Sequence, residues 1–275
     1  MGTGVGVVAI GCDDPAAVWN RAVAAGATAP PATAGGAAAA GIAVRVPGME
    51  PVTHLLVPRA RDAAGRGPGE PGSGDGTAPQ CVDHLALSVR TGELAGVTGF
   101  YRDGLGLTRI HTEYVEVGDQ AMDSTVVRSG SGGLTLTLVE PVAEREAGQL
   151  TDFLAANDGP GVQHVALLVG DLVTAKARVA AGGAGVRFLD TPDSYYDVLA
   201  ERVALPGGEI DALRGTGILL DTDGFGSLLQ IFTRSPFPRG TLFYELVERR
   251  AARSFGSANI RALFEAVARD RLKLP

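Results

Sequence analysis

The sequence lacks the features that mark membrane, secreted and nucleic-acid-binding proteins. No apolar run approaches the roughly 18–20 residues of a transmembrane helix. Residues 1–9 lack the basic start and apolar core of a signal peptide. Two cysteines, Cys12 and Cys81, cannot form a disulfide framework, and the net charge of −7 argues against general affinity for nucleic acid. We therefore expect a cytoplasmic globular protein, with one or two domains in its 275 residues.

Residues 61–80 (RDAAGRGPGEPGSGDGTAPQ) form the clearest break in the chain. They are rich in glycine, proline and charge and contain almost nothing to bury, so they are predicted to be a flexible linker. The glycine-rich part follows no strand and lacks the Lys-Ser/Thr of a phosphate loop, so nucleotide binding is not supported. The linker separates a first domain, residues 1–60, from a second, residues 81–275.

Two segments after the linker resemble each other. Residues 82–89 (VDHLALSV) and 162–169 (VQHVALLV) are both β-rich and have a histidine at the third position. Each leads into a helical stretch, 93–103 in the first case and 171–181 in the second, and then into further strand-like runs. The two histidines lie 80 positions apart, which indicates an internal repeat.

A third copy precedes the linker. Residues 5–12 (VGVVAIGC) align with the two segments above, and residues 52–59 (VTHLLVPR) close the unit. Val7 stands where the other copies have histidine, and Leu55 stands opposite Glu245, so this copy is expected to have no metal ligands. Each unit is predicted to have the order β-α-β-β-β. The predicted fold class is therefore α+β, with repeated βαβββ units paired into a half-open barrel. Pairing is expected because a single strongly twisted sheet leaves edge strands with unpaired backbone groups.

His84, His164 and Glu245 are the candidate metal ligands. The histidines occupy equivalent places on the first strands of two paired units, and alternation along a strand then turns both toward one cavity. Two imidazoles and one carboxylate leave three positions of an octahedral metal open, the pattern typical of Fe(II) oxygenases. From the pattern alone, hydrogen-bonded core histidines and a solvent-facing glutamate remain the alternative. The other two histidines, His54 and His111, have no carboxylate at a suggestive spacing and are predicted to be structural or exposed.

Four stretches closely resemble the 4-hydroxyphenylpyruvate dioxygenase family, which belongs to the vicinal-oxygen-chelate superfamily and includes 4-hydroxymandelate synthases. They are GVQHVALLV (161–169), FLDTPDSYYDVL (188–199), LLQIFTRSPFPRGTLFYELVERR (228–250) and FGSANIRALFEAVARD (255–270). The similarity extends over residues 81–271. It implies an enzyme in which His84, His164 and Glu245 bind Fe(II) and whose substrates are 4-hydroxyphenylpyruvate and O2. We expect no membrane or nucleic-acid partner, and the sequence leaves open whether the protein is a homo-oligomer.

The resemblance also implies a set of substrate contacts. Two departures from the dioxygenases favour the synthase branch: Val139 replaces an asparagine in a P-x-N-E-P segment, and Ile260 replaces a phenylalanine after Asn259. We therefore expect benzylic hydroxylation to 4-hydroxymandelate and CO2, with homogentisate formation or non-catalytic binding as alternatives. The expected substrate-binding residues are Ser124, Thr137, Val139, Gln230, Phe232, Phe243, Phe255 and Ile260. Gln163, beside His164, is expected to support that ligand.

The ends of the chain complete the expected organisation. Ile260, Leu263, Phe264 and Val267 follow helical spacing and form one apolar stripe, so a C-terminal helix is predicted to close the cavity. The family usually has four units in two pairs, whereas this chain has three. The resemblance therefore implies that residues 1–60 are a truncated N-terminal domain with a single unit, and that residues 81–275 are the catalytic Fe(II) domain.

Overall fold

The structure is a computed structural model that describes most of the chain. The described residues are 4–30, 41–59, 77–143, 145–146, 148–183, 185–203, 205, 208–256 and 258–261. Most of the predicted linker, residues 61–80, lies outside these ranges, as do Leu263, Phe264 and Val267 of the predicted last helix. None of the helices in the described part of the chain has the length and apolar character needed to cross a membrane.

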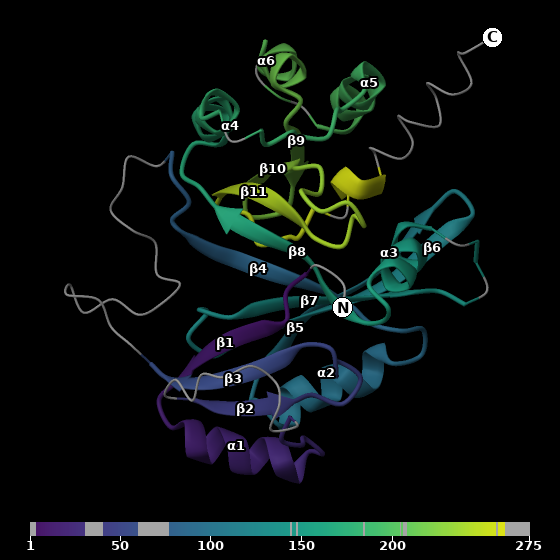
Figure 1. Cartoon of the computed structure of the whole chain (residues 1–275). Helices are drawn as coiled ribbons and strands as arrows, with labels where there is room; N and C mark the ends of the chain where they lie inside the picture. Colours follow the sequence, from purple (N-terminus) through teal and green to yellow (C-terminus); the bar gives the residue numbers. More distant parts are fainter. Residues whose placement is uncertain are drawn as a thin grey trace.

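An eight-stranded mixed sheet forms most of the molecule, in the order β5-β6-β7-β4-β8-β11-β10-β9 (Figure 1). One half contains β4 (Cys81–Ser88), α2 (Leu94–Asp103), β5 (Thr108–Val117), β6 (Gln120–Arg128) and β7 (Thr135–Pro141). After α3 (Gln149–Ala156), the other half contains β8 (Gly161–Leu168), α4 (Leu172–Ala181), α5 (Asp193–Arg202), α6 (Glu209–Thr216), β9 (Leu219–Thr222), β10 (Ser227–Phe232) and β11 (Phe243–Arg250). The two halves confirm the predicted α+β class and the paired units of a half-open barrel.

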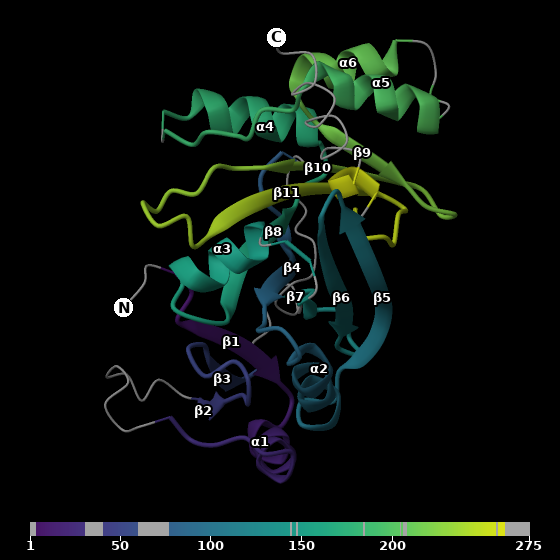
Figure 2. The same ribbon diagram turned by 90° about the vertical axis from the view of Figure 1, so that its right-hand side faces the viewer.

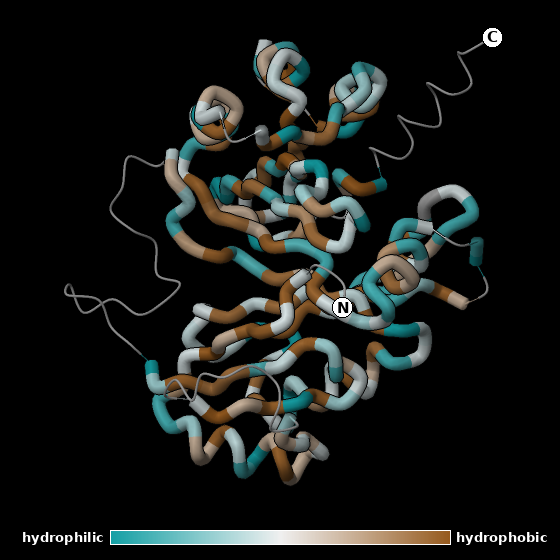
Figure 3. Tube along the Cα trace, in the orientation of Figure 1, coloured by the Kyte–Doolittle hydropathy of each residue, from teal (hydrophilic) through white to brown (hydrophobic). Residues whose placement is uncertain are grey.

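Helices pack against both halves of this curled sheet. Figures 1 and 2 place α4, α5 and α6 on one side of the molecule and α2 on the other, with the strands between them. Hydrophobic residues run along the central strands (Figure 3), and two large apolar clusters pack the helices against the sheet. The repeat did not predict α3, α5 or α6. The helix α5 has a recognisable start, because Pro192 precedes it and Asp193 lies in its first turn.

The two halves meet where β4 pairs with β8 in antiparallel orientation. The register places His84 opposite Ala166 and Ala86 opposite His164. On the far side of β8, the parallel strand β11 places Glu245 opposite Ala166 as well. Ala166, which is small and fully buried on the middle strand β8, therefore lies between His84 on β4 and Glu245 on β11. Side chains two residues apart on a strand share one face, so His164 lies on the same face as this row.

The first unit forms a separate three-stranded sheet in the order β1-β3-β2. Its elements are β1 (Val7–Cys12), α1 (Pro15–Ala24), β2 (Ile42–Arg45) and β3 (Thr53–Pro58). The strands β1 and β3 pair in parallel, with Val7 opposite Thr53 and Ala9 opposite Leu55. The same register joins β8 to β11, so Val7 and Leu55 occupy the positions that His164 and Glu245 occupy in the second half of the large sheet.

His54 on β3 joins the first unit to α2. Its side chain is fully buried, and its Nε2 atom lies 2.9 Å from the hydroxyl of Tyr101. Burial lowers the pKa of His54 to about 4, because the charged imidazolium loses its hydration in the apolar cluster around it. His54 is therefore a neutral core histidine, whereas the side chain of His111 is exposed and contacts Glu113.

This burial makes stability depend on pH. The unfolded chain binds a proton at His54 near pH 6.5, whereas the folded chain binds it only near pH 4, so stability should be complete above pH 6.5 and fall as the pH decreases toward 4. The loss attributable to His54 should reach about 3 kcal/mol. Urea unfolding of the wild type and of His54→Gln, measured between pH 4 and 7, checks this difference. Equal pH profiles for the two proteins would contradict it.

Candidate metal centre

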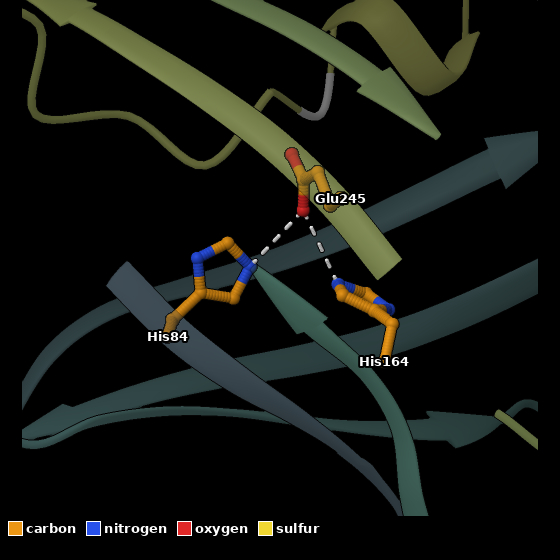
Figure 4. Close-up of side chains that lie close together, drawn as sticks. All are labelled: His84, His164 and Glu245. Atoms are coloured by element: carbon orange, nitrogen blue, oxygen red, sulfur yellow. Dashed lines mark ion pairs between the residues drawn. The ribbon is translucent and has the colours of Figure 1, made fainter. Parts of the chain in front are cut away.

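Three side chains from three neighbouring strands converge on one point inside the barrel (Figure 4). His84 extends from β4, His164 from β8 and Glu245 from β11. The Oε2 atom of Glu245 lies 3.5 Å from Nε2 of His84 and 3.4 Å from Nε2 of His164. The potential ligand atoms all lie within 4.8 Å of one another. Glu245 is 1% exposed and His84 is 4% exposed, whereas the His164 side chain is 15% exposed where it faces the adjoining cavity.

The arrangement of these three residues fits a divalent metal ion. A metal that bonds each ligand at about 2.1 Å in octahedral geometry holds adjacent ligand atoms about 3.0 Å apart, and the two separations between Glu245 and the histidines are 3.4 and 3.5 Å. Burial lowers the pKa of His164, an effect that the neighbouring Glu245 partly offsets, so burial favours the neutral imidazole, which is the form that binds a metal. Two imidazoles and one carboxylate are the facial set that non-haem Fe(II) oxygenases use.

Each ligand is oriented by a neighbouring polar side chain. The Nδ1 atom of His84 lies 2.7 Å from Oδ1 of Asp83, and the Nδ1 atom of His164 lies 3.3 Å from Oε1 of Gln163. With Nε2 of each ring directed at Glu245, Nδ1 is the nitrogen that has the hydrogen and donates it. Asp83 and Gln163 occupy equivalent positions in the repeat, each immediately before its histidine.

The carboxylate ligand is held by a buried chain of hydrogen bonds. The Nε2 atom of Gln230 donates to Oε1 of Glu245 over 2.6 Å, and Nδ2 of Asn259 donates to Oε1 of Gln230 over 2.7 Å. The hydroxyl of Tyr195 donates in turn to Oδ1 of Asn259 over 2.8 Å. Because all four side chains are buried, the chain fixes which oxygen of Glu245 remains free to face the histidines.

Beside the three ligands lies a cavity of about 450 Å³. Its lining includes most of the substrate-binding residues expected from the sequence: Thr137, Val139, Gln230, Phe232, Phe243, Phe255 and Ile260. Ser124 is not among the lining residues, and its hydroxyl instead donates to the backbone carbonyl of Glu113 on the neighbouring strand. The lining also includes Gln149, Leu150 and Thr151 of α3, which the repeat pattern did not single out. The spacing of Leu150 and Phe153, with Asn157-Asp158-Gly159-Pro160 after them, is the signal that could have found this helix.

Phenylalanine rings form the wall around the histidines. Phe243 stacks on His164 with ring centroids 4.9 Å apart, and Phe232 meets Phe243 edge to face at 6.1 Å. Phe255 meets His84 edge to face at 5.6 Å. These contacts restrict the imidazole rings from a second direction and leave aromatic surface facing the cavity.

Thr137 on β7 occupies the place that corresponds to Glu245. It pairs with Ala86 as Glu245 pairs with Ala166, so the two residues are related by the repeat. The Oγ1 atom of Thr137 is buried and has no hydrogen-bond partner among the described residues. A buried hydroxyl without a partner is costly, and a ligand in the adjoining cavity is the group that can satisfy it.

The fold and the site together define a class of protein in which paired βαβββ units enclose a centre of two histidines and one carboxylate. Residues 82–226 match the family model described as the glyoxalase/bleomycin resistance protein/dioxygenase superfamily. The chain belongs to this superfamily.

Individual proteins of known name are also similar to this chain. The protein MelA of Shewanella colwelliana is 33% identical over 70% of this chain, and 4-hydroxyphenylpyruvate dioxygenase of Danio rerio is 32% identical over 69% of it. The matches cover 54% and 49% of those two proteins, so the chain spans about half the length of the curated relatives. A solved structure of a triple mutant of 4-hydroxymandelate synthase from Streptomyces coelicolor is 43% identical, with a TM-score of 0.77, and the match covers 98% of this chain and 76% of the other.

A metal that binds this centre should stabilise the fold. Adding Co(II), or Fe(II) under anaerobic conditions, should raise the Tm of the wild type, because the metal binds the folded state and not the unfolded one. At a metal concentration about 100 times Kd, the gain should be about 2.7 kcal/mol. His164→Ala should remove the response, while His111→Ala, which changes an exposed histidine, should keep it. A rise in Tm that survives in His164→Ala would contradict the ligand set; thermal unfolding followed by circular dichroism measures it.

Proposed function

We propose that this protein is an Fe(II)-dependent oxygenase that converts 4-hydroxyphenylpyruvate and O2 into 4-hydroxymandelate and CO2. The convergence of His84, His164 and Glu245 beside an aromatic-walled cavity is the observation that supports the proposal most strongly. The named relatives support the choice of substrate, since they include a 4-hydroxyphenylpyruvate dioxygenase and a 4-hydroxymandelate synthase.

In the proposed enzyme, His84, His164 and Glu245 would hold the iron beside the cavity. Bound Fe(II) supplies the centre at which an α-keto acid can chelate and O2 can be reduced. The protein's own residues orient the organic acid. Phe232 and Phe243 offer aromatic surface to a phenol ring, and the hydroxyl of Thr137 can donate a hydrogen bond to an oxygen of the acid.

The apolar walls of the cavity suit oxidative chemistry. They include residues of α3 together with Phe255 and Ile260. Apolar walls reduce the amount of water beside the metal site, which strengthens electrostatic contacts and protects a reactive species from side reactions. The hydrogen-bonded chain from Glu245 to Tyr195 keeps the carboxylate ligand in one orientation while the substrate changes.

The choice of product rests on two apolar positions. Val139 is 8% exposed on β7 and lines the cavity, and Ile260 lines it from the C-terminal segment. Neither side chain can donate a hydrogen bond to the phenol, and Ile260 provides no aromatic face for the ring. We infer that the ring is held so that its benzylic carbon, rather than a ring carbon, faces the oxidant. The position of the substrate ring within the cavity can decide which product forms, because small displacements of reacting atoms change rates by orders of magnitude.

Product analysis tests the proposed function. Protein loaded with Fe(II) should consume 4-hydroxyphenylpyruvate and O2 in equal amounts and release CO2, with 4-hydroxymandelate as the main product. Homogentisate is an isomer of 4-hydroxymandelate, so the two must be separated by chromatography or identified by NMR rather than by mass. Homogentisate as the main product would favour a dioxygenase. Tight binding of the keto acid with no O2 uptake would favour a non-catalytic binding protein.

Substitutions at the two apolar positions test the basis of the product choice. The double variant Val139→Asn/Ile260→Phe should raise the ratio of homogentisate to 4-hydroxymandelate by about tenfold, which corresponds to about 1.4 kcal/mol between the two barriers. Val173→Asn changes an exposed valine on α4, away from the cavity, and is the matched control. An unchanged product ratio in the double variant, with activity retained, would contradict the assignment of these two residues.

A further inference from the structure

Arg249 near the end of β11 lies between a candidate metal ligand and the segment that completes the cavity. Its Nε atom donates to Oδ2 of Asp83 over 2.7 Å, and its Nη2 atom donates to Oδ1 over 2.8 Å. The same Oδ1 atom accepts from Nδ1 of His84. Arg249 thus forms two parallel hydrogen bonds with the carboxylate that orients His84.

The other end of the guanidinium faces the segment after β11. The Nη1 atom of Arg249 donates to the backbone carbonyl of Ser254 over 2.7 Å and approaches that of Ala252 at 3.4 Å. The guanidinium carbon lies 5.1 Å from the centre of the Phe255 ring, a distance typical of a cation–π contact. Phe255 in turn meets His84 edge to face. Arg249 therefore reaches His84 by two routes, through Asp83 and through Phe255.

The internal repeat shows that this arrangement belongs to one histidine only. Gln163 is the counterpart of Asp83, and it contacts His164 at the longer distance of 3.3 Å. The counterpart of Arg249 in the first half of the sheet is Pro141, which has no side-chain donor. The first half of the sheet therefore adopts the same strand arrangement without an equivalent ion pair, so the fold does not require the pair. The pair is also largely buried, with side-chain exposures of 16% for Arg249 and 9% for Asp83.

We propose that Arg249 is a positioning residue that couples the orientation of His84 to the ordering of residues 252–256. The two parallel bonds to Asp83 fix the plane of that carboxylate, and the carboxylate fixes the rotation of the imidazole about its long axis. The hydrogen bond to Ser254 and the contact with Phe255 place residues 252–256 against the same imidazole. Metal bound at His84 then orders residues 252–256, and an ordered segment strengthens metal binding by the same factor.

The proposal rests on the metal centre described above, and the test uses a metal ion alone. Co(II) binding to purified protein, followed by its visible absorption, gives an affinity without any turnover. Hydrogen exchange of residues 251–256, measured with and without Co(II), gives the response of the segment. In the wild type, Co(II) should bind and should slow exchange in this segment.

Arg249→Met should weaken Co(II) binding by about 10–100-fold, as changes next to metal ligands commonly do, and should remove the effect of Co(II) on exchange. Arg249→Lys keeps the charge but cannot form both parallel bonds, so its affinity should lie between those of the wild type and Arg249→Met. If Arg249→Met fails to fold because Asp83 is left unpaired, Asp83→Asn/Arg249→Met removes both charges, and it should show the same two losses.

Two control variants separate positioning from general stability. Asp223 accepts hydrogen bonds from the backbone amides of Arg253 and Ser254, and its charge acts on Arg249 without a hydrogen bond to it, to His84 or to Asp83 among the described residues. Asp223→Ala should therefore speed exchange in the segment while keeping the Asp83–Arg249 pair, and its Co(II) affinity should fall far less than that of Arg249→Met. Arg253→Met changes an exposed arginine that contacts Phe225, and it should alter neither measurement.

Three results would overturn the proposal. Co(II) affinity within about threefold of the wild type in Arg249→Met or in the double variant would show that the pair does not position His84. An equal loss of affinity in Asp223→Ala would show that Arg249 acts only by holding the segment. A wild type that binds no Co(II) would contradict the metal centre itself, and the coupling with it.

Discussion

The antiparallel pairing of β4 with β8 is the constraint on which the rest of the site depends. It brings together two histidines that lie 80 positions apart and places each opposite an alanine, with the parallel strand β11 adding Glu245 beside Ala166. Because side chains alternate along a strand, a slip of one residue would turn the ligands to the other face of the sheet. The small alanines leave room above the sheet for a metal, and larger side chains there would fill it.

Polar partners hold the three ligands in place before any metal arrives. Asp83, Gln163 and Gln230 each contact one ligand atom that does not face the centre. The arrangement reduces the cost of burying Glu245 and two imidazoles, since buried polar groups without partners are strongly destabilising. It also reduces the rearrangement that metal binding requires. The unpartnered hydroxyl of Thr137 faces the same cavity, which suits an oxygen-rich ligand in the space that the three residues leave free.

The repeat explains why the convergence of His84, His164 and Glu245 could be predicted from the sequence. Equivalent positions in two copies converge by symmetry, and the copy with Val7 and Leu55 shows the same strand register without the ligands. The ion pair of Asp83 with Arg249 could not be found in this way, because the equivalent positions of the repeat are Gln163 and Pro141. The resemblance also placed Ser124 at the substrate, and in the structure its hydroxyl donates to the backbone carbonyl of Glu113 on the neighbouring strand.

We propose that His84, His164 and Glu245 form one Fe(II) site whose free positions accept an α-keto acid. Absorption spectroscopy under anaerobic conditions is the sharpest test of this site. Adding 4-hydroxyphenylpyruvate to the Fe(II)-loaded wild type should produce a visible charge-transfer band, because the keto acid chelates the metal. The same addition to His164→Ala should produce none. No band in the wild type, or an undiminished band in His164→Ala, would show that these three residues do not form such a site.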